Sequence, residues 1–297
     1  MPSSVDWDAL RLSFTRTPDL DEDQRWSTWE QTAHTVDRGP QPFPSWVVQH
    51  SGAVDTELGV LKTGKEADAF LIERALPAGQ RTGAPGESVL MVAKRYRTAE
   101  HSSFRRSQDY AQGRRVRDSR EMRAMARGTA FGREAASGSW ARTEFDLLSS
   151  MWGAGLPVPY PVQIVGTEVC MEYIGDEGDA APRLAESTPA TPREACAWRD
   201  QLREVVIGLA GLGFAHGDLS AYNVLVDNRP GSGGQLVVID VPQAVDLVGN
   251  PAGIDFLARD CRNLCTWLSS RGVVVDPEEW LQDALAAAGL GGRPTAR

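Results

Sequence analysis

The spacing of hydrophobic residues divides the chain into a strand-rich first half and a helical second half. Apolar runs at 58–61, 69–72 and 89–94 predict a hairpin followed by a third strand. Two further short runs, at 162–165 and 168–173, predict two more strands. Between these groups, residues 139–152 place apolar side chains at helical spacing before a Gly- and Pro-rich stop, which predicts a helix.

After Gly175 the pattern becomes mainly helical. Thr191-Pro192-Arg193-Glu194 is a capping box with proline at the first helical position, and it predicts a helix running to 211–213. Strand-like segments at 224–227 and 235–241 follow, and helices are predicted at about 252–270 and 277–288. Strands followed by helices indicate an α+β fold in two lobes, with a ligand site between them.

Composition is that of an ordinary folded protein. The 297 residues are 41% hydrophobic and 24% charged, and this length predicts two domains or one bilobal unit. No apolar run is long enough to span a membrane and the first residues lack a signal-peptide pattern, so we expect a cytoplasmic protein without membrane contact. No C-x-x-C pair occurs, and we expect buried free thiols at Cys170, Cys196, Cys261 and Cys265.

Charge is distributed unevenly along the chain. The net charge of −9 argues against general affinity for nucleic acid, but residues 94–133 hold twelve Lys and Arg against four acids. Such a block is either a solvated loop or a surface that faces an anion or RNA, for example in contact with the ribosome. The sequence leaves both readings open.

One segment, His216 to Asn223, carries the strongest chemical signal. It places Asp218 and Asn223 five residues apart in a predicted loop, and Asp240 follows the apolar strand 235–239. This set suits phosphoryl transfer, in which one carboxylate orients the attacking oxygen while an amide and a second carboxylate hold Mg²⁺ against phosphates. Oxygen ligands without a Cys or His cluster favour Mg²⁺ over zinc.

Two upstream features add to this set. Val92-Ala93-Lys94 resembles the kinase strand whose lysine contacts the α- and β-phosphates, and Glu144 in the predicted helix is the candidate acid to pair with Lys94. The turn 62–67 almost matches a Walker A loop, but Glu66 stands where Ser or Thr is needed and the turn joins two strands. We therefore reject a Walker loop, although such a turn can lay N–H groups and the Thr63 hydroxyl over phosphates.

Together these segments resemble the RIO family of atypical serine/threonine protein kinases, on its RIO1-like branch. The resemblance covers roughly residues 56–288, and its matching segments are 62–67, 92–94, 140–144, 171–175, 216–223, 239–245 and 256–261. It implies a bilobal protein-kinase-like fold with a small β-rich N-lobe and a mainly helical C-lobe. The expected divisions are an extension at 1–55, an N-lobe at 56–174 with a flexible basic loop near 100–135, a C-lobe at 175–288 and a tail at 289–297.

The resemblance also implies ATP and Mg²⁺ as cofactors and phosphoryl transfer to serine, including the chain's own, or to water. Asp218 and Asp240 would be the catalytic residues, Asp218 as the base, and an aspartate at the position of Asp240 is associated in the family with a phosphoaspartate. Asn223 and Asp240 would bind the metal. The ATP contacts would come from Lys62, Thr63, Gly64, Lys65, Glu66, Lys94, Glu144 and the backbone of Glu172 and Ile174.

The chain departs from the family pattern at two positions near the phosphates. Lys62 and Pro242 each replace a usual serine. No Ala-Pro-Glu segment follows Asp240, so we expect no extended activation loop or peptide-docking platform, as in the family. Two alternatives remain at this stage. Aminoglycoside or choline kinases share the His-Gly-Asp-x4-Asn pattern and would transfer phosphate to a small molecule. The other is a catalytically silent scaffold that binds ATP or RNA. The protein acceptor is not specified by the sequence.

Overall fold

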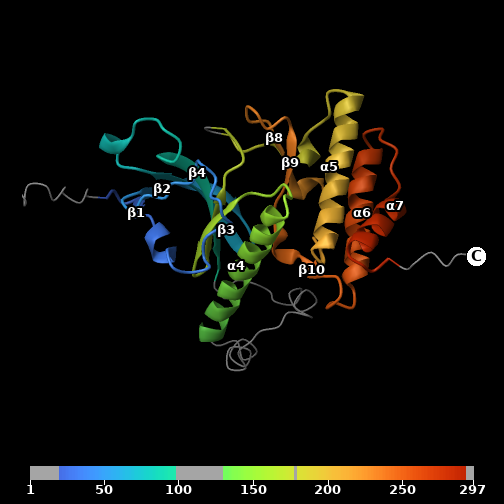
Figure 1. The fold of residues 1–297 in the computed structure, drawn as a ribbon, viewed down its shortest axis with the longest axis horizontal. Coiled ribbons are helices and arrows are strands. Elements are labelled where there is room, and N and C mark those ends of the chain that lie inside the picture. The colour runs from blue at the N-terminus through green and yellow to red at the C-terminus, as the bar shows by residue number, and fades with distance from the viewer. Residues whose placement is uncertain (1–19, 98–129, 177–178, 292–297) are drawn as a thin grey trace, which may run out of the picture.

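The computed structural model describes residues 20–97, 130–176 and 179–291. Figure 1 shows a sheet on one side, the helices α5, α6 and α7 on the other, and α4 lying between them. The predicted α+β fold with a β-rich N-lobe and a helical C-lobe is confirmed.

The N-lobe is built on a six-stranded antiparallel sheet. Its strands lie in the order β1-β2-β3-β4-β6-β5, so β4 is central and is paired on both sides. This position places Lys94 in the middle of the sheet, opposite Ala69 of β3 and Val169 of β6. The bounds are Gln24–Trp26 for β1, Val54–Thr63 for β2, Ala67–Ala75 for β3, Ser88–Tyr96 for β4, Pro161–Val165 for β5 and Glu168–Glu172 for β6.

Part of the segment at 20–53 belongs to this lobe. Strand β1 pairs with β2, so the sheet begins well ahead of the boundary expected at residue 56. Among the described residues before β2, the helical structure is a single 3-10 turn, Trp29–Thr32, and the segment after it is rich in proline. Trp29 is buried, and the centre of its ring lies 5.3 Å from that of Phe43.

A buried ionic network fixes the sheet from within. Arg74 is fully buried and donates to Asp55 at 2.6 and 2.9 Å and to Gln163 at 2.8 Å. All of the charge on this arginine is therefore matched inside the lobe, which a buried cation requires. The network joins β2, β3 and β5.

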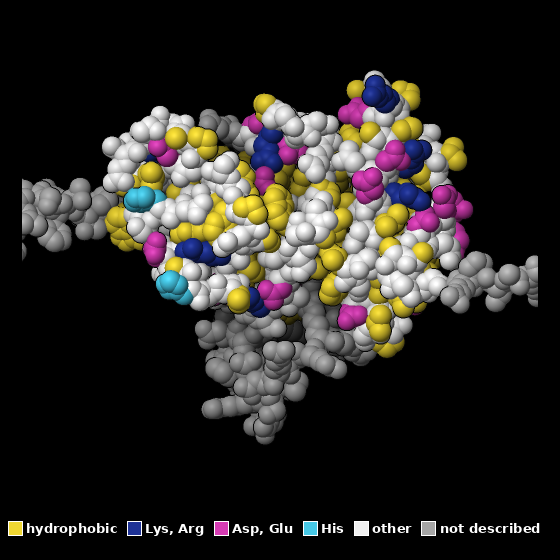
Figure 2. Space-filling model, in the orientation of Figure 1, with side chains coloured by type: hydrophobic (Ala, Val, Ile, Leu, Met, Phe, Trp, Pro, Cys, Tyr) yellow, Lys and Arg dark blue, Asp and Glu magenta, His cyan; other side chains and the backbone are white. Residues whose placement is uncertain are grey.

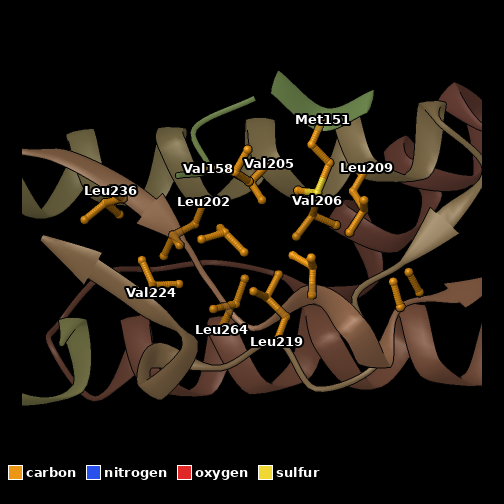
Figure 3. Packing of buried hydrophobic residues seen from close by; sticks show 14 of the residues in the cluster. Met151, Val158, Leu202, Val205, Val206, Leu209, Leu219, Val224, Leu236 and Leu264 are labelled. Atoms are coloured by element: carbon orange, nitrogen blue, oxygen red, sulfur yellow. The ribbon is translucent and has the colours of Figure 1, made fainter. Parts of the chain in front are cut away.

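Helix α4 (Ala130–Gly153) connects the two lobes. It begins before the expected start at 139, so the end of the loop expected near 100–135 is helical, while 98–129 lies outside the described residues. Two glycines in its first half, Gly132 and Gly138, weaken the local helix signal in the sequence. Near its end, Met151 points into the C-lobe core beside Val206 and Leu209 (Figure 3).

The C-lobe packs three helices against two short strand pairs. Thr191 caps α5 by accepting from the Glu194 N–H at 3.1 Å, as the sequence predicts. In Figure 3 apolar side chains from α5, α6 and the β8–β9 hairpin point toward one another. The bounds are Pro192–Gly211 for α5, Phe214–Ala215 for β7, Val224–Asp227 for β8, Gln235–Val238 for β9, Val245–Asp246 for β10, Gly253–Ser269 for α6 and Pro277–Ala287 for α7.

The cysteines are all free, as predicted, but they are not all buried. Cys170, Cys261 and Cys265 lie in the interior, whereas Cys196 is exposed, so the prediction is wrong for Cys196. Helical periodicity explains the difference. Ala195 lies on the face of α5 that packs on the C-lobe core, and its neighbour Cys196 lies on the solvent-exposed face.

The visible surface carries a mixture of charges. On the face drawn in Figure 2, acidic and basic side chains are interspersed along the helical lobe. Among the helices of the described ranges, none combines the length and apolar character needed to cross a bilayer.

Candidate active site

A cavity of ≈ 1310 Å³ lies between the two lobes. The sheet, α4, the segment after β6 and the loops of the C-lobe all contribute to its walls. Ten of the predicted site residues line it, and two do not: Thr63 and Asn223. The ten are Lys62, Gly64, Lys65, Glu66, Lys94, Glu144, Glu172, Ile174, Asp218 and Asp240.

Lys94 and Glu144 form the ion pair that the sequence predicts. Lys94 Nζ lies 2.7 Å from Glu144 Oε1 and 3.2 Å from Asp240 Oδ1. The Glu144 side chain is only 2% exposed and that of Lys94 16%. Burial alone would lower the pKa of Lys94, but the Glu144 and Asp240 carboxylates outweigh it and raise the pKa above its ordinary value. Lys94 is therefore a fixed positive charge.

Asp240 has an unusual backbone. It follows β9 with φ 65° and ψ 51°, the only positive φ at a non-glycine position among the described residues. Such a conformation costs energy and turns the chain sharply, so that the carboxylate lies in the cavity. Lys62 Nζ is 4.0 Å from its Oδ2. Burial would raise the pKa of Asp240, but Lys94 and Lys62 outweigh it and hold the pKa below its ordinary value.

The loop that carries Asp218 is held by its own hydrogen bonds. Asn223 Nδ2 donates to the Asp218 carbonyl at 2.9 Å, which leaves the Asp218 carboxylate exposed to the cavity. Gly217 has φ 84°, and a Cβ there would lie 2.5 Å from the Gln243 carbonyl oxygen. Only glycine fits this approach between the Asp218 loop and the segment after Asp240. His216 Nε2 adds a contact of 3.1 Å to the Ile239 carbonyl.

Sequence reasoning missed Asp260, which supports this loop from α6. Its carboxylate accepts from the Gly217 and Leu219 N–H groups at 2.9 Å each, and it is 1% exposed. Burial raises the pKa of Asp260, with the two N–H groups opposing that shift. A signal was present in the sequence: an acid between Leu257 and Leu264 on the apolar stripe of a helix calls for a buried partner.

Part of the cavity wall is apolar. The segment 171–174 runs along it after β6, where Glu172 and Ile174 were predicted to offer backbone hydrogen bonds to a base. The Glu172 carboxylate accepts from Arg229 Nη2 at 2.8 Å and from the Tyr160 N–H at 3.2 Å, so its side chain fixes this segment to the β8–β9 loop. The apolar walls are Ala69, Val92, Met171, Leu225 and Ile239.

The turn between β2 and β3 brings cations to the cavity. The chain contains three lysines, Lys62, Lys65 and Lys94, and all three line it, whereas every other basic residue except histidine is arginine. Glu66 lies beside them, and burial together with Asp240 raises the pKa of Glu66. Thr63, on the same turn, does not line the cavity.

The basic segment begins with cations that are already paired. Arg95 donates to Glu168 at 2.6 Å and also contacts Glu57, and Arg97 donates to Asp68 at 2.6 and 2.7 Å. These arginines are engaged within the sheet rather than presented to an outside anion. The following part of the predicted RNA-facing segment, 98–129, lies outside the described residues.

Comparison of the sequence with known protein families identifies the family of this chain. The model of the RIO domain matches residues 81–280. The chain belongs to the RIO family of atypical kinases. RIO-type serine/threonine-protein kinase Rio1 of Haloferax volcanii is 32% identical over 225 residues, which cover 76% of this chain and 67% of that protein. The resemblance stated from the sequence is thereby confirmed at the level of the family.

Other RIO relatives match over shorter regions. Serine/threonine-protein kinase RIO3 of Caenorhabditis elegans is 37% identical over 138 residues, 45% of this chain and 26% of that protein. A crystal structure of the Rio2 kinase–ADP/Mg²⁺–phosphoaspartate complex from Chaetomium thermophilum has a TM-score of 0.50 at 19% identity, covering 81% of this chain and 64% of that chain. This likeness supports the kinase fold.

Proposed function

We propose that the cavity binds Mg-ATP and that the chain transfers the γ-phosphoryl group to a serine hydroxyl, its own or that of another protein, or to water. The observation that carries the proposal is the contact of Lys94 with both Glu144 and Asp240 in a cavity that Asp218 also lines. Phosphoryl transfer needs mainly positioning and charge stabilisation, and this cluster supplies both. The solved Rio2 kinase with ADP and Mg²⁺ supports the same class of ligand.

The residues at Asp240 fit a magnesium ion that arrives with the nucleotide. Asp240 and Asn223 offer carboxylate and amide oxygens, the ligands that Mg²⁺ prefers. Within the described ranges, no three His, Cys, Asp or Glu side chains are grouped to hold a metal by themselves, so phosphate and water would complete the set. When bound, the ion would neutralise charge developing on the phosphates.

The chain's own side chains divide the remaining work. Lys94 would bind the α- and β-phosphates, and Glu144 would keep its ammonium directed toward them. Lys62 and Lys65 would approach the triphosphate from the β2–β3 turn. Asp218 would accept the proton of the attacking hydroxyl, a role worth roughly 10²- to 10⁴-fold in rate. The apolar part of the cavity wall would contact the adenine.

A test follows the γ-phosphate of labelled ATP with the full chain. Label on protein that survives hydroxylamine indicates phosphoserine, label that hydroxylamine releases indicates an acyl phosphate such as one on Asp240, and free phosphate indicates hydrolysis. Any of the three, lost in Asp218→Asn, supports the proposal. Bound ATP without release or transfer of label would favour the alternative of a silent ATP-binding protein.

A further inference from the structure

The Glu144 carboxylate has a second buried partner besides Lys94. Its Oε1 accepts from Lys94 Nζ at 2.7 Å, and its Oε2 accepts from Tyr96 Oη at 2.5 Å. Tyr96 is 5% exposed and Glu144 2%. Each oxygen of this buried carboxylate therefore has its own donor.

Tyr96 reaches Glu144 because of its place on β4. Residues two apart on a strand point to the same face, so Lys94 and Tyr96 both face α4, the helix that carries Glu144. Lys94 Nζ also lies 5.5 Å from the centre of the Tyr96 ring, within cation–π range. The ring itself is part of the main hydrophobic core. Tyr96 thus contacts both members of the ion pair from a rigid position.

The direction of the hydrogen bond is fixed. Burial and the adjacent Glu144 carboxylate raise the pKa of Tyr96 well above its ordinary value, so the hydroxyl keeps its proton and donates it. An ionised carboxylate can only accept. Among the described residues, no other donor contacts Glu144 Oε2, so removal of the hydroxyl would leave that oxygen buried and unpaired.

We propose that Tyr96 is a positioning residue: its hydroxyl holds Glu144 Oε2, so that Oε1 stays directed at Lys94 and Lys94 stays directed at the nucleotide phosphates. This inference rests on the proposed function, because it assigns Lys94 to the phosphates. Without the hydroxyl, the carboxylate is free to rotate toward Lys94 with both oxygens and draw the ammonium away from the ligand.

Tyr96→Phe tests this inference because it removes one oxygen atom and keeps the ring. We expect the affinity for Mg-ADP, measured by titration calorimetry, to fall about tenfold, the scale of one hydrogen bond to a charged group. The affinity for adenosine, which has no phosphate for Lys94, should change less than about twofold. A loss confined to the phosphate-bearing ligand is not expected from general destabilisation.

Tyr160→Phe is the matched control. Tyr160 is also a buried tyrosine of the N-lobe, and its hydroxyl donates to the Pro40 carbonyl at 2.9 Å, away from Lys94. Tyr160→Phe should lower the midpoint of unfolding about as much as Tyr96→Phe does, without lowering the affinity for Mg-ADP. In the Glu144→Gln background, Tyr96→Phe should add less than about twofold, because residues acting through one group are not additive.

The outcomes separate the two proposals. If the parent binds Mg-ADP and Tyr96→Phe binds it equally well, or loses adenosine to the same extent, the positioning role is overturned and the proposed function stands. An additive loss in the Glu144→Gln background also overturns the positioning role. If the parent protein binds no Mg-ADP, the proposed function is overturned and this inference falls with it.

Discussion

Lys94 on β4 and Asp240 after β9, 146 residues apart in the sequence, lie 3.2 Å apart across the interface of the two lobes. The ammonium proposed to hold the phosphates thus contacts the carboxylate proposed to hold the metal. The same two side chains would face a Mg-nucleotide in the cavity.

Lysine reactivity offers a footprint of the cavity. Because Lys62, Lys65 and Lys94 are the chain's three lysines and all line the cavity, amine acetylation read by mass spectrometry reports on this site. In the free protein Lys62, with a side chain 56% exposed, should react faster than Lys94, which is 16% exposed. Saturating Mg-ATP should slow the acetylation of Lys62 and Lys94 by about fivefold or more, because bound nucleotide would cover both amines.

Adenosine and the N-terminal amine serve as controls in this footprint. Adenosine should leave Lys62 unprotected, and the amine should react equally in all samples. Equal reactivity of Lys62 and Lys94 with and without Mg-ATP would contradict their assignment to the phosphates.

Glu144 should matter for turnover far more than its neighbour on the same helix. Glu144→Gln removes the charge that anchors Lys94, and a displacement of about 1 Å at a reacting centre can cost roughly 100-fold, so we expect phosphoryl transfer to fall about 10- to 100-fold. Asp146→Asn is the control, because Asp146 is 57% exposed and pairs only with Arg142 at 2.9 Å among the described residues. It should stay within about twofold of the parent. Equal effects of the two substitutions would contradict the account.

The acid stability of the N-lobe should depend on Glu168. Burial would raise its pKa, but Arg25 and Arg95 outweigh burial and lower it. A lowered pKa stabilises the fold above the unfolded value of about 4.3, and this stabilisation is lost as the pH falls through the folded-state pKa. Glu168→Gln should therefore lower the free energy of unfolding by about 1–3 kcal/mol at pH 7.

Urea unfolding at several pH values measures this difference. The difference in the free energy of unfolding between the parent and Glu168→Gln should decrease as the pH falls below about 4. A gap that stays constant with pH would show that the ion pairs of Glu168 are not its source.

The RNA-facing reading of the basic segment predicts a salt-dependent contact with RNA. Replacing three of its arginines should make the slope of log affinity against log salt shallower by about 2, since each phosphate contact on single strands contributes about 0.7. The substituted residues are Arg114, Arg115 and Arg117, and the control replaces Arg193, Arg199 and Arg203 of α5. Binding of a single-stranded oligonucleotide at several salt concentrations measures the slope. An unchanged slope would leave the segment as a solvated loop.

Much of the fold was accessible from local patterns. Short apolar runs located β2, β3 and β4, and the Thr191 capping box located the start of α5. The early start of α4 was missed because Gly132 and Gly138 weaken the local helix signal. Strand β1 was missed because a strand of three residues is too short to show a hydrophobic period, and only its pairing with β2 defines it.

Site residues could be predicted where the chemistry requires a particular residue type. They were missed where the contact depends on how the side chains pack in the folded structure. Lys94, Glu144, Asp218 and Asp240 meet in the cavity as their chemistry suggested. Tyr96 was overlooked because a tyrosine on a buried strand is usually a core residue. Only its 2.5 Å hydrogen bond to Glu144 in the structure suggests the proposed positioning role. Thr63 was predicted to contact the phosphates together with its turn, but unlike Lys62 and Gly64 it does not line the cavity, a difference that sequence spacing does not reveal.

The most direct test of the account is Mg²⁺-dependent ATP turnover by the purified chain, with Asp218→Asn and Asp240→Asn measured beside it. The account predicts phosphate release or autophosphorylation in the parent and a loss of about 10²-fold or more in Asp218→Asn, with nucleotide binding retained. Asp240→Asn should lose turnover together with the Mg²⁺ dependence of nucleotide binding. Turnover in Asp218→Asn equal to that of the parent would contradict the assignment of this cavity as a phosphotransfer site.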